Sequence, residues 1–247
     1  MKYKIYVAGW YFEEYEKFYQ SILPLKDHVI VGSHREIPEK ISSVYKSKFY
    51  ENIGGGIGLY EQLRLDEEFS EMNDQDFVIF MHDDAEILRL DFPEKLFEIL
   101  QTKKCAGNSI ELPLYHGFKD IEAAEKYAKG DWFQKAKAIP DFKWKVIDGR
   151  CFAIKTETLR EINGLEDMYW GTDHRTTNYS LRLFSAKLAC YYGTECVDSI
   201  SDQWLVSDYI IEDTGDNPNR AKNQTLSSKL NKIKKLIISK YSSLKNK

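Results

Sequence analysis

Apolar and polar positions along the chain repeat with two periods, one typical of strands and one typical of helices. Apolar runs predict strands at residues 3–8, 28–32, 77–81, 105–110 and 149–154. Helical spacing predicts helices at residues 11–22, 58–69, 92–100, 156–162 and 173–186. Because strands and helices alternate, we predict an α/β fold with a mostly parallel sheet flanked by helices.

Three stretches depart from this alternation. Residues 113–145 mix aromatic residues, lysines and prolines, and we interpret them as an insertion or long loops beside a site. Residues 213–221 are rich in turn formers and predict a linker. The predicted organisation is therefore a domain over residues 1–212, the linker, and a C-terminal helix over residues 222–247.

Composition narrows the class of protein. With 247 residues, 43% hydrophobic and 14% aromatic, the chain suits a folded domain, and its net charge of −4 gives no general case for nucleic-acid binding. The longest apolar runs are about five residues, far below the roughly 20 that span a bilayer, and no secretory signal is expected. Four cysteines show no CxxC pair or zinc spacing, which favours reduced thiols and a cytoplasmic location.

Two adjacent carboxylates follow the strongest apolar run. His82, Asp83 and Asp84 come directly after residues 77–81. Ligands of parallel sheets bind beyond the carboxyl ends of strands, and a divalent cation there would let the two carboxylates face an anionic substrate. A solvated turn at the strand end is the alternative.

Two further stretches carry candidate chemistry. The glycine-rich residues 52–58 open a predicted helix, where backbone amides can approach a phosphate, or they form a flexible turn. Residues 151–183 lead through a strand, a helix and an aromatic loop to Asp173 at the start of another helix. Asp173 is a candidate base or a helix N-cap, and Trp170 is a sugar platform or a core residue.

In their order, these stretches resemble the GT-A glycosyltransferases, and among them the inverting family 2 enzymes. The resemblance covers about residues 3–200, and its motifs lie at residues 52–54, 82–84, 152–155, 164–167, 173 and 181–183. It implies a Rossmann-like nucleotide-diphospho-sugar transferase fold. It also implies transfer of a sugar, with inversion, from a nucleoside diphosphate sugar to an acceptor hydroxyl of a surface or lipid-linked glycan.

The resemblance also implies roles for individual residues. Asp84 would coordinate Mn²⁺ or Mg²⁺ on the two phosphates, and Asp83 would support the metal shell or contact the ribose. Asp173 would be the base, and Trp170 and Arg182 would bind the acceptor. The implied nucleotide contacts are Ala8, Gly9, Ser33, Asn52, Gly54, Gly55, His82 and Asp83.

The sequence departs from the family pattern in two places. Ser33 or His34 stands where the family has an Asp after the second strand, and Asp198 or Asp202 stands where it has a late metal-binding His. Two alternatives therefore stay open. One is a catalytically degenerate scaffold that binds membranes or partners, and the other is a nucleotidyltransferase, although residues 7–10 lack the basic, glycine-rich signature of that class.

Residues 222–247 predict a basic amphipathic helix. They contain eight lysines and no Asp or Glu. Apolar residues recur at spacings of three and four on one helical face, at Leu226, Leu230, Ile233, Ile237, Tyr241 and Leu244. Such a helix can lie on an anionic membrane surface, which would place the protein peripherally on the inner membrane face. The alternative is that the helix packs on the domain or on a second subunit of an oligomer.

Overall fold

The computed structural model describes residues 2–9, 12, 16–51, 55–83, 85–113, 143–164, 184, 185, 187–200 and 204–207. The chain divides into two units, Met1–Asp208 and Tyr209–Lys247. The predicted linker and C-terminal helix lie outside the described residues. Within the described ranges, none of the helices combines the length and the apolar character needed to cross a membrane.

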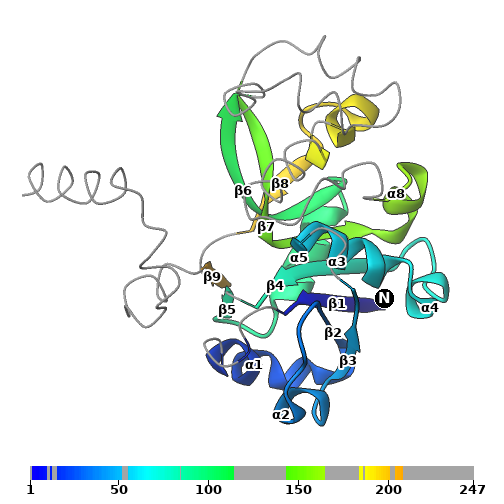
Figure 1. Ribbon diagram of the computed structural model, residues 1–247. Helices are drawn as coiled ribbons and strands as arrows, with labels where there is room; N and C mark the ends of the chain where they lie inside the picture. The colour runs from blue at the N-terminus through cyan, green and yellow to red at the C-terminus, as the bar shows by residue number, and fades with distance from the viewer. Residues whose placement is uncertain are drawn as a thin grey trace, which may run out of the picture. The chain divides into compact units, whose positions relative to one another are not determined.

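The core of the first unit is a seven-stranded mixed sheet (Figure 1). Its strands run in the order β3-β2-β1-β4-β7-β6-β8. Neighbours among β1 to β4 are parallel, β7 is antiparallel to both β4 and β6, and β8 is parallel to β6. This confirms the predicted mostly parallel α/β sheet. The strands are β1 (Tyr3–Ala8), β2 (Val29–Ser33), β3 (Lys46–Phe49), β4 (Phe77–His82), β6 (Cys105–Pro113), β7 (Lys143–Lys155) and β8 (Val197–Ser199).

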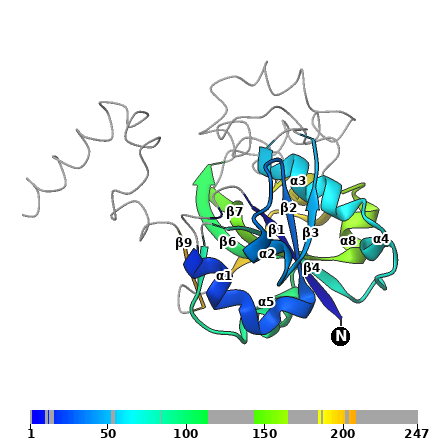
Figure 2. The same cartoon turned by 60° about the horizontal axis from the view of Figure 1, so that its bottom comes forward.

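Helices cover both faces of the sheet because side chains alternate between the faces along each strand. Tyr6 and Phe80 belong to the hydrophobic cluster that also holds residues of α3 (Gly55–Arg64) and α8 (Thr156–Glu161). On the other face, Phe77 stacks on Phe97 of α5 (Phe92–Leu100), with ring centroids 5.6 Å apart. Figure 2 shows α3 on one side of the strands and α1 (Glu16–Ile22) and α5 on the other.

Several short elements were not predicted. They are the 3₁₀ helix η1 (Leu23–His28), the helices α2 (Glu39–Ser42) and α4 (Glu67–Ser70), and the strands β3, β5 (Ala85–Ile87), β8 and β9 (Leu205–Ser207). The predicted helix at residues 58–69 is in fact two helices, because the chain breaks at Asp66 between α3 and α4. The described part of the predicted first helix begins only at Glu16, and helical residues continue past residue 186 to residue 192.

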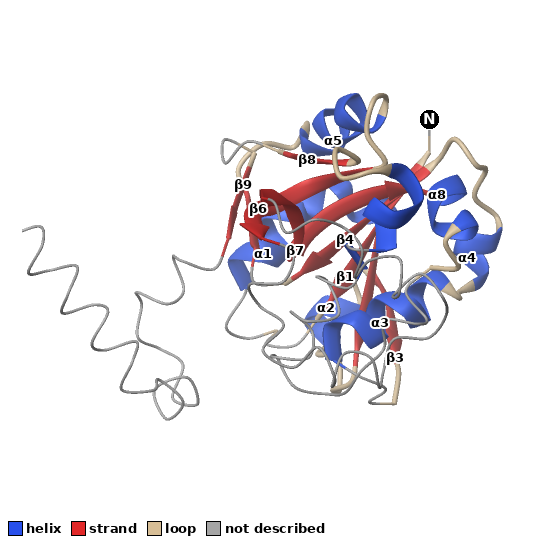
Figure 3. Ribbon diagram, turned by 90° about the horizontal axis from the view of Figure 1, so that it is seen from above, coloured by secondary structure: helices blue, strands red, loops and turns tan. Residues whose placement is uncertain are grey.

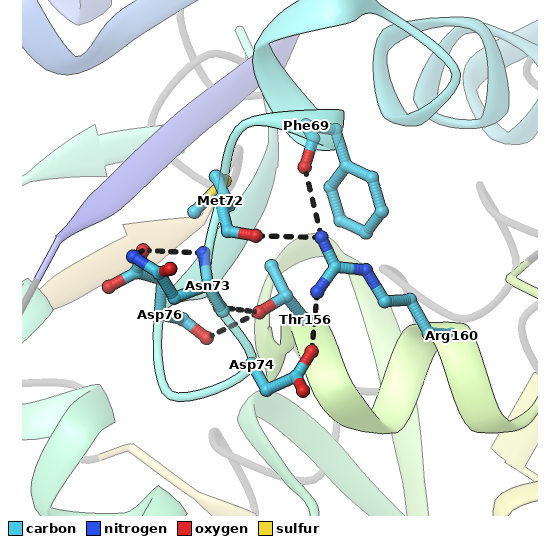
Figure 4. A network of polar contacts seen from close by, with 7 residues as sticks. All are labelled: Phe69, Met72, Asn73, Asp74, Asp76, Thr156 and Arg160. Carbon is cyan, nitrogen blue, oxygen red and sulfur yellow. Dashed lines mark hydrogen bonds and ion pairs between the residues drawn. The ribbon is translucent and has the colours of Figure 1, made fainter.

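A polar network holds the amino end of β4 to α8 (Figure 4). The guanidinium of Arg160 donates to the carbonyls of Met72, at 2.7 Å, and Phe69, and forms an ion pair with Asp74. The Thr156 hydroxyl donates to the carbonyl of Asp76 at 3.1 Å. These contacts lie at the amino end of β4, whereas the candidate site lies at its carboxyl end.

Candidate functional site

The carboxyl ends of three parallel strands meet at one edge of the sheet. In the strand register Ala8 pairs with Gly32 on one side and with His82 on the other. The Gly9 amide continues the ladder by donating to the Gly32 carbonyl at 2.8 Å. The next positions along the three strands, Gly9, Ser33 and Asp83, therefore share this edge. Because β1 has β2 on one side and β4 on the other, the edge is a switch point, where sheets of this type bind ligands.

Asp83 is a buried carboxylate with a donor from helix α1. It is 2% exposed, and the Tyr19 hydroxyl donates to its Oδ2 at 3.2 Å. Burial, the negative charge of Asp83 and the hydrogen bond to Asp83 all raise the pKa of Tyr19, so the phenol stays protonated. The hydroxyl of Tyr45 donates to the Tyr19 carbonyl and fixes the backbone at this position.

Gly9 leaves the space that brings Tyr19 and Asp83 together. A Cβ at Gly9 would lie 2.6 Å from Cε1 of Phe12 and 3.0 Å from the Tyr19 hydroxyl oxygen. Phe12 and Tyr19 also pack against each other, with ring centroids 5.9 Å apart. The glycine is therefore required by side-chain packing under the edge, whatever its role towards a ligand.

Ser33 and His34 are engaged in local hydrogen bonds after β2. Ser33 is fully buried, and its Oγ accepts from the Arg35 amide at 3.0 Å. His34 Nδ1 lies 3.3 Å from the Tyr50 carbonyl oxygen. Ser33 thus stabilises the turn that follows β2.

His82 and Asp83 point to opposite faces of the sheet, as neighbours at a strand end do. The His82 ring packs against Tyr60 of α3, with centroids 5.6 Å apart, whereas Asp83 meets Tyr19 of α1. Ala8 is buried in the hydrophobic cluster that also contains Tyr60. Gly55 begins α3, so the predicted glycine-rich helix start is present, while Asn52 and Gly54 lie outside the described residues.

The other predicted functional residues fall in two groups. Asp84, Trp170, Asp173 and Arg182 lie outside the described residues. Asp198 is described and lies in β8. It pairs with Ala106 of β6, Ala106 pairs with Ala153 of β7, and Ala153 pairs with Ile79 of β4. Two strands, β6 and β7, therefore separate β8 from β4. At about 4.8 Å per strand Asp198 lies roughly 14 Å from β4 and level with a residue four positions before Asp83. The structure does not bring Asp198 to the acidic strand end.

A divalent cation at this edge would need several donor side chains close together. Within the described ranges, no group of three or more His, Cys, Asp or Glu side chains is arranged to hold one. Asp83 already receives the Tyr19 hydrogen bond, and Asp198 lies elsewhere. The described residues therefore do not form a metal site by themselves.

Sequence reasoning missed Tyr19, which is 4% exposed and contacts the buried carboxylate. Its spacing with Phe18 and Ile22 gives the ordinary apolar face of a helix, and all three are buried. The only available signal was a hydroxyl on that face, because Asp83 lies 64 residues further along the chain.

No protein-family model matches the sequence, and no curated protein matches it. Solved structures with a similar chain path include GalNAc-T7 with UDP, GalNAc and Mn²⁺, which is 10% identical with a TM-score of 0.44 over 73% of this chain and 40% of that chain. A putative glucose-1-phosphate thymidylyltransferase from Bacillus anthracis, in complex with a sucrose, is 12% identical with a TM-score of 0.46 over 86% and 93%. The galactosyltransferase LgtC, in complex with donor and acceptor sugar analogs, is 12% identical with a TM-score of 0.38 over 79% and 73%. Glycosyltransferases and a nucleotidyltransferase thus both occur among the similar structures, and at these identities no activity or ligand is transferred from them to this chain.

Proposed function

We propose that the protein is a nucleotide-sugar-dependent glycosyltransferase whose donor binds at the carboxyl edge of β1, β2 and β4. The observation that supports this most is the register that brings Gly9, Ser33 and Asp83 to one switch-point edge, with a buried carboxylate at the end of β4. Gly55, at the start of α3, follows β3 by a short connection and adds backbone amides for a phosphate.

The proposed reaction is a single displacement. The oxygen of an acceptor hydroxyl forms a bond to the anomeric carbon as the bond to the nucleoside diphosphate breaks, and the sugar configuration inverts. Asp173 takes the hydroxyl proton, and the diphosphate leaves with the electron pair. Trp170 and Arg182 contact the acceptor, which is a surface or lipid-linked glycan.

The two acidic residues have different proposed roles. Asp83 is almost fully buried, so it fits support of the turn better than direct contact with the ribose. Asp84 is the proposed ligand for Mn²⁺ or Mg²⁺, which would neutralise charge on the leaving diphosphate. We do not include Asp198 in this site because β7 and β6 separate it from β4.

Binding and product analysis test the proposal. Calorimetry with ADP, GDP, UDP and CDP, with and without MnCl₂, identifies the base and any metal dependence. Nucleotide-sugars carrying that base should then release nucleoside diphosphate. Release of pyrophosphate from a nucleoside triphosphate and a sugar 1-phosphate would instead identify a nucleotidyltransferase. If no nucleotide binds, the degenerate scaffold is the correct reading.

Two variants assign the roles within the site. Asp84→Ala should lose the metal-dependent part of donor binding and keep its unfolding midpoint, because in the sequence Asp84 lies beyond the apolar run of β4. Asp173→Asn should keep donor binding and lose about 10²-fold or more in turnover, because an amide matches the shape of a carboxylate and does not accept the proton. Full turnover of Asp173→Asn would point to another base.

A further inference from the structure

The acidic turn joins two separate sheets. Asp83 follows β4 of the seven-stranded sheet, and Ala85 begins β5, which pairs antiparallel with β9 in a two-stranded sheet. Ala85 pairs with Ser207 and Ile87 with Leu205. Figure 3 shows this pair beside α1, at the margin of the main sheet. The segments before and after position 84 therefore pair in different sheets.

Helix α1 contacts the chain on both sides of position 84. The Tyr19 hydroxyl donates to Asp83 at 3.2 Å, and the Ile87 amide on the far side of the turn lies 3.4 Å from the Ser21 hydroxyl oxygen, which can accept from it. Both contacts are made by one short helix. They limit movement of the turn relative to α1.

The segment after β5 has further contacts with Trp204, which directly precedes β9. Its carbonyl accepts from the Leu88 amide at 2.9 Å, and its indole Nε1 donates to Asp91 Oδ1 at 3.1 Å. The Arg89 guanidinium lies 4.7 Å from the ring centroid, and the Lys95 ammonium of α5 lies 5.5 Å from it. Arg89 is also paired with Asp91 at 2.8 Å. These contacts form what we call the Trp204 clasp, made of Leu88, Arg89, Asp91, Lys95 and Trp204.

The clasp has features that simple local packing does not require. It joins the Arg89–Asp91 ion pair to an aromatic ring, and Trp204 comes from a segment more than 100 residues after the turn. Because β5 has only three residues, its pairing with β9 alone is a weak constraint. The contacts of the Trp204 ring with Arg89 and Lys95 are an additional constraint on the chain after the acidic turn.

We propose that Trp204 is a positioning residue, which limits movement of the strand end at Asp83 through the clasp on β5. This inference rests on the proposed function in so far as the turn belongs to the donor site. The position of the turn itself can be measured without any ligand.

The experiment compares Trp204→Ala and Trp204→Phe with the wild type. Arg160→Ala is the matched control, because its network lies at the amino end of β4 and it should lower stability without touching the turn. Amide hydrogen exchange is followed by mass spectrometry in a peptide covering residues 82–88. Binding of ADP, GDP, UDP and CDP is measured by calorimetry well below every unfolding midpoint.

We expect exchange at residues 82–88 to increase in the order wild type, Trp204→Phe, Trp204→Ala, because Phe keeps a ring for the cations and loses the hydrogen bond to Asp91. Nucleotide binding should weaken in the same order, by about 2- to 30-fold, the range for coupling through a distant residue. Arg160→Ala should change neither quantity. The order also includes a conservative variant, so it does not depend on the folding of Trp204→Ala.

Two results would overturn the inference. One is unchanged exchange at residues 82–88 in both Trp204 variants. The other is faster exchange together with wild-type nucleotide affinity, since the clasp would then act on stability alone. If the wild type binds none of the four nucleotides, the proposed function fails, and the exchange measurement alone decides whether Trp204 positions the turn.

Discussion

Buried tyrosine hydroxyls in this protein differ in whether they have a partner. Tyr19 donates to Asp83, whereas the Tyr6 hydroxyl is buried without a hydrogen-bond partner among the described residues. Tyr19→Phe should therefore lower the free energy of unfolding by about 1–3 kcal/mol, because it removes a donor from a buried carboxylate. Tyr6→Phe should be neutral or stabilising, since it removes an unsatisfied polar group. Urea unfolding of both variants measures the contrast, and equal losses would show that the Tyr19 hydrogen bond contributes nothing.

Gly107 and Gly193 are required for different reasons, one steric and the other conformational. A Cβ at Gly107 would lie 2.4 Å from the Cys151 carbonyl oxygen and 2.5 Å from Cα of Phe152, both backbone atoms at the irregularity between β6 and β7. Gly107→Ala should cost about 1–3 kcal/mol or more, because the pairing of two central strands must shift. Gly193, with φ of 85°, has open space around it, so Gly193→Ala should cost only about 1–2 kcal/mol for its left-handed backbone. Thermal unfolding of the two variants gives the order, and a larger loss at Gly193 would contradict it.

At the level of elements, the break between α3 and α4 is tied to the edge strand β3. Asp66, between the two helices, accepts hydrogen bonds from Lys48 of β3 and from the Tyr50 hydroxyl at 3.1 Å. Burial alone would raise the pKa of Asp66, and the hydrogen bonds from Lys48 and Tyr50 outweigh it and lower the pKa below its ordinary value of 3.8. The carboxylate therefore stabilises the fold above that value, and the contribution is lost as the pH falls through the lower, folded pKa.

This sign gives a prediction for Asp66→Asn. The variant should be less stable than the wild type at pH 7, because the ion pair with Lys48 is lost. The difference should narrow as the pH falls below about 4, where the unfolded wild type gains a proton on Asp66 that the folded protein resists. Urea midpoints at pH 7, 5 and 3.5 measure it. A gap that stays constant over this range would exclude the carboxylate charge as its cause.

The elements that could be predicted are those that carry their own signal. The buried strands β1 and β4 are continuous apolar runs, and α5 has a regular apolar face. The edge strand β3 reads KSKF, and its two lysines are held by Asp66 and Glu68, so its pattern is polar and it was missed. The strands β5 and β9 have three residues each and acquire their conformation only by pairing across the chain.

The candidate site follows the same rule. The position of Asp83 at a strand end was predictable because an apolar run precedes it. The partner of Asp83 was not, because Tyr19 approaches from a helix whose spacing is satisfied equally well by core packing. Gly9 is predicted to contact the nucleotide, and the structure adds a packing requirement against Phe12 and Tyr19. Contacts between distant segments thus decide what each residue of the edge does.

In the first unit, the two ends of β4 make different kinds of contact. The amino end is closed by Thr156 and Arg160, which bond to backbone carbonyls of the preceding turn (Figure 4). The carboxyl end carries a buried acid and the junction with a second small sheet. Changes at the amino end should therefore act on stability alone, which is why Arg160→Ala can serve as a control for the nucleotide edge.

The basic segment at residues 222–247 allows location to be separated from chemistry. If it forms the predicted amphipathic helix on a membrane, its eight lysines each add about 1 kcal/mol at most near an anionic leaflet, and its apolar face contributes independently of charge. A chain ending at residue 221 should then fail to sediment with vesicles containing phosphatidylserine or phosphatidylglycerol and should bind nucleotide like the full chain.

Salt and lipid composition complete this test. High salt should weaken vesicle binding of the full chain without abolishing it, because only the lysine contribution is screened. Vesicles of phosphatidylcholine alone should bind it less, because they lack the anionic charge that attracts lysines. If the full chain ignores anionic vesicles, and the shortened chain unfolds or loses an oligomer in sedimentation, the segment is a packing element and the membrane proposal is wrong.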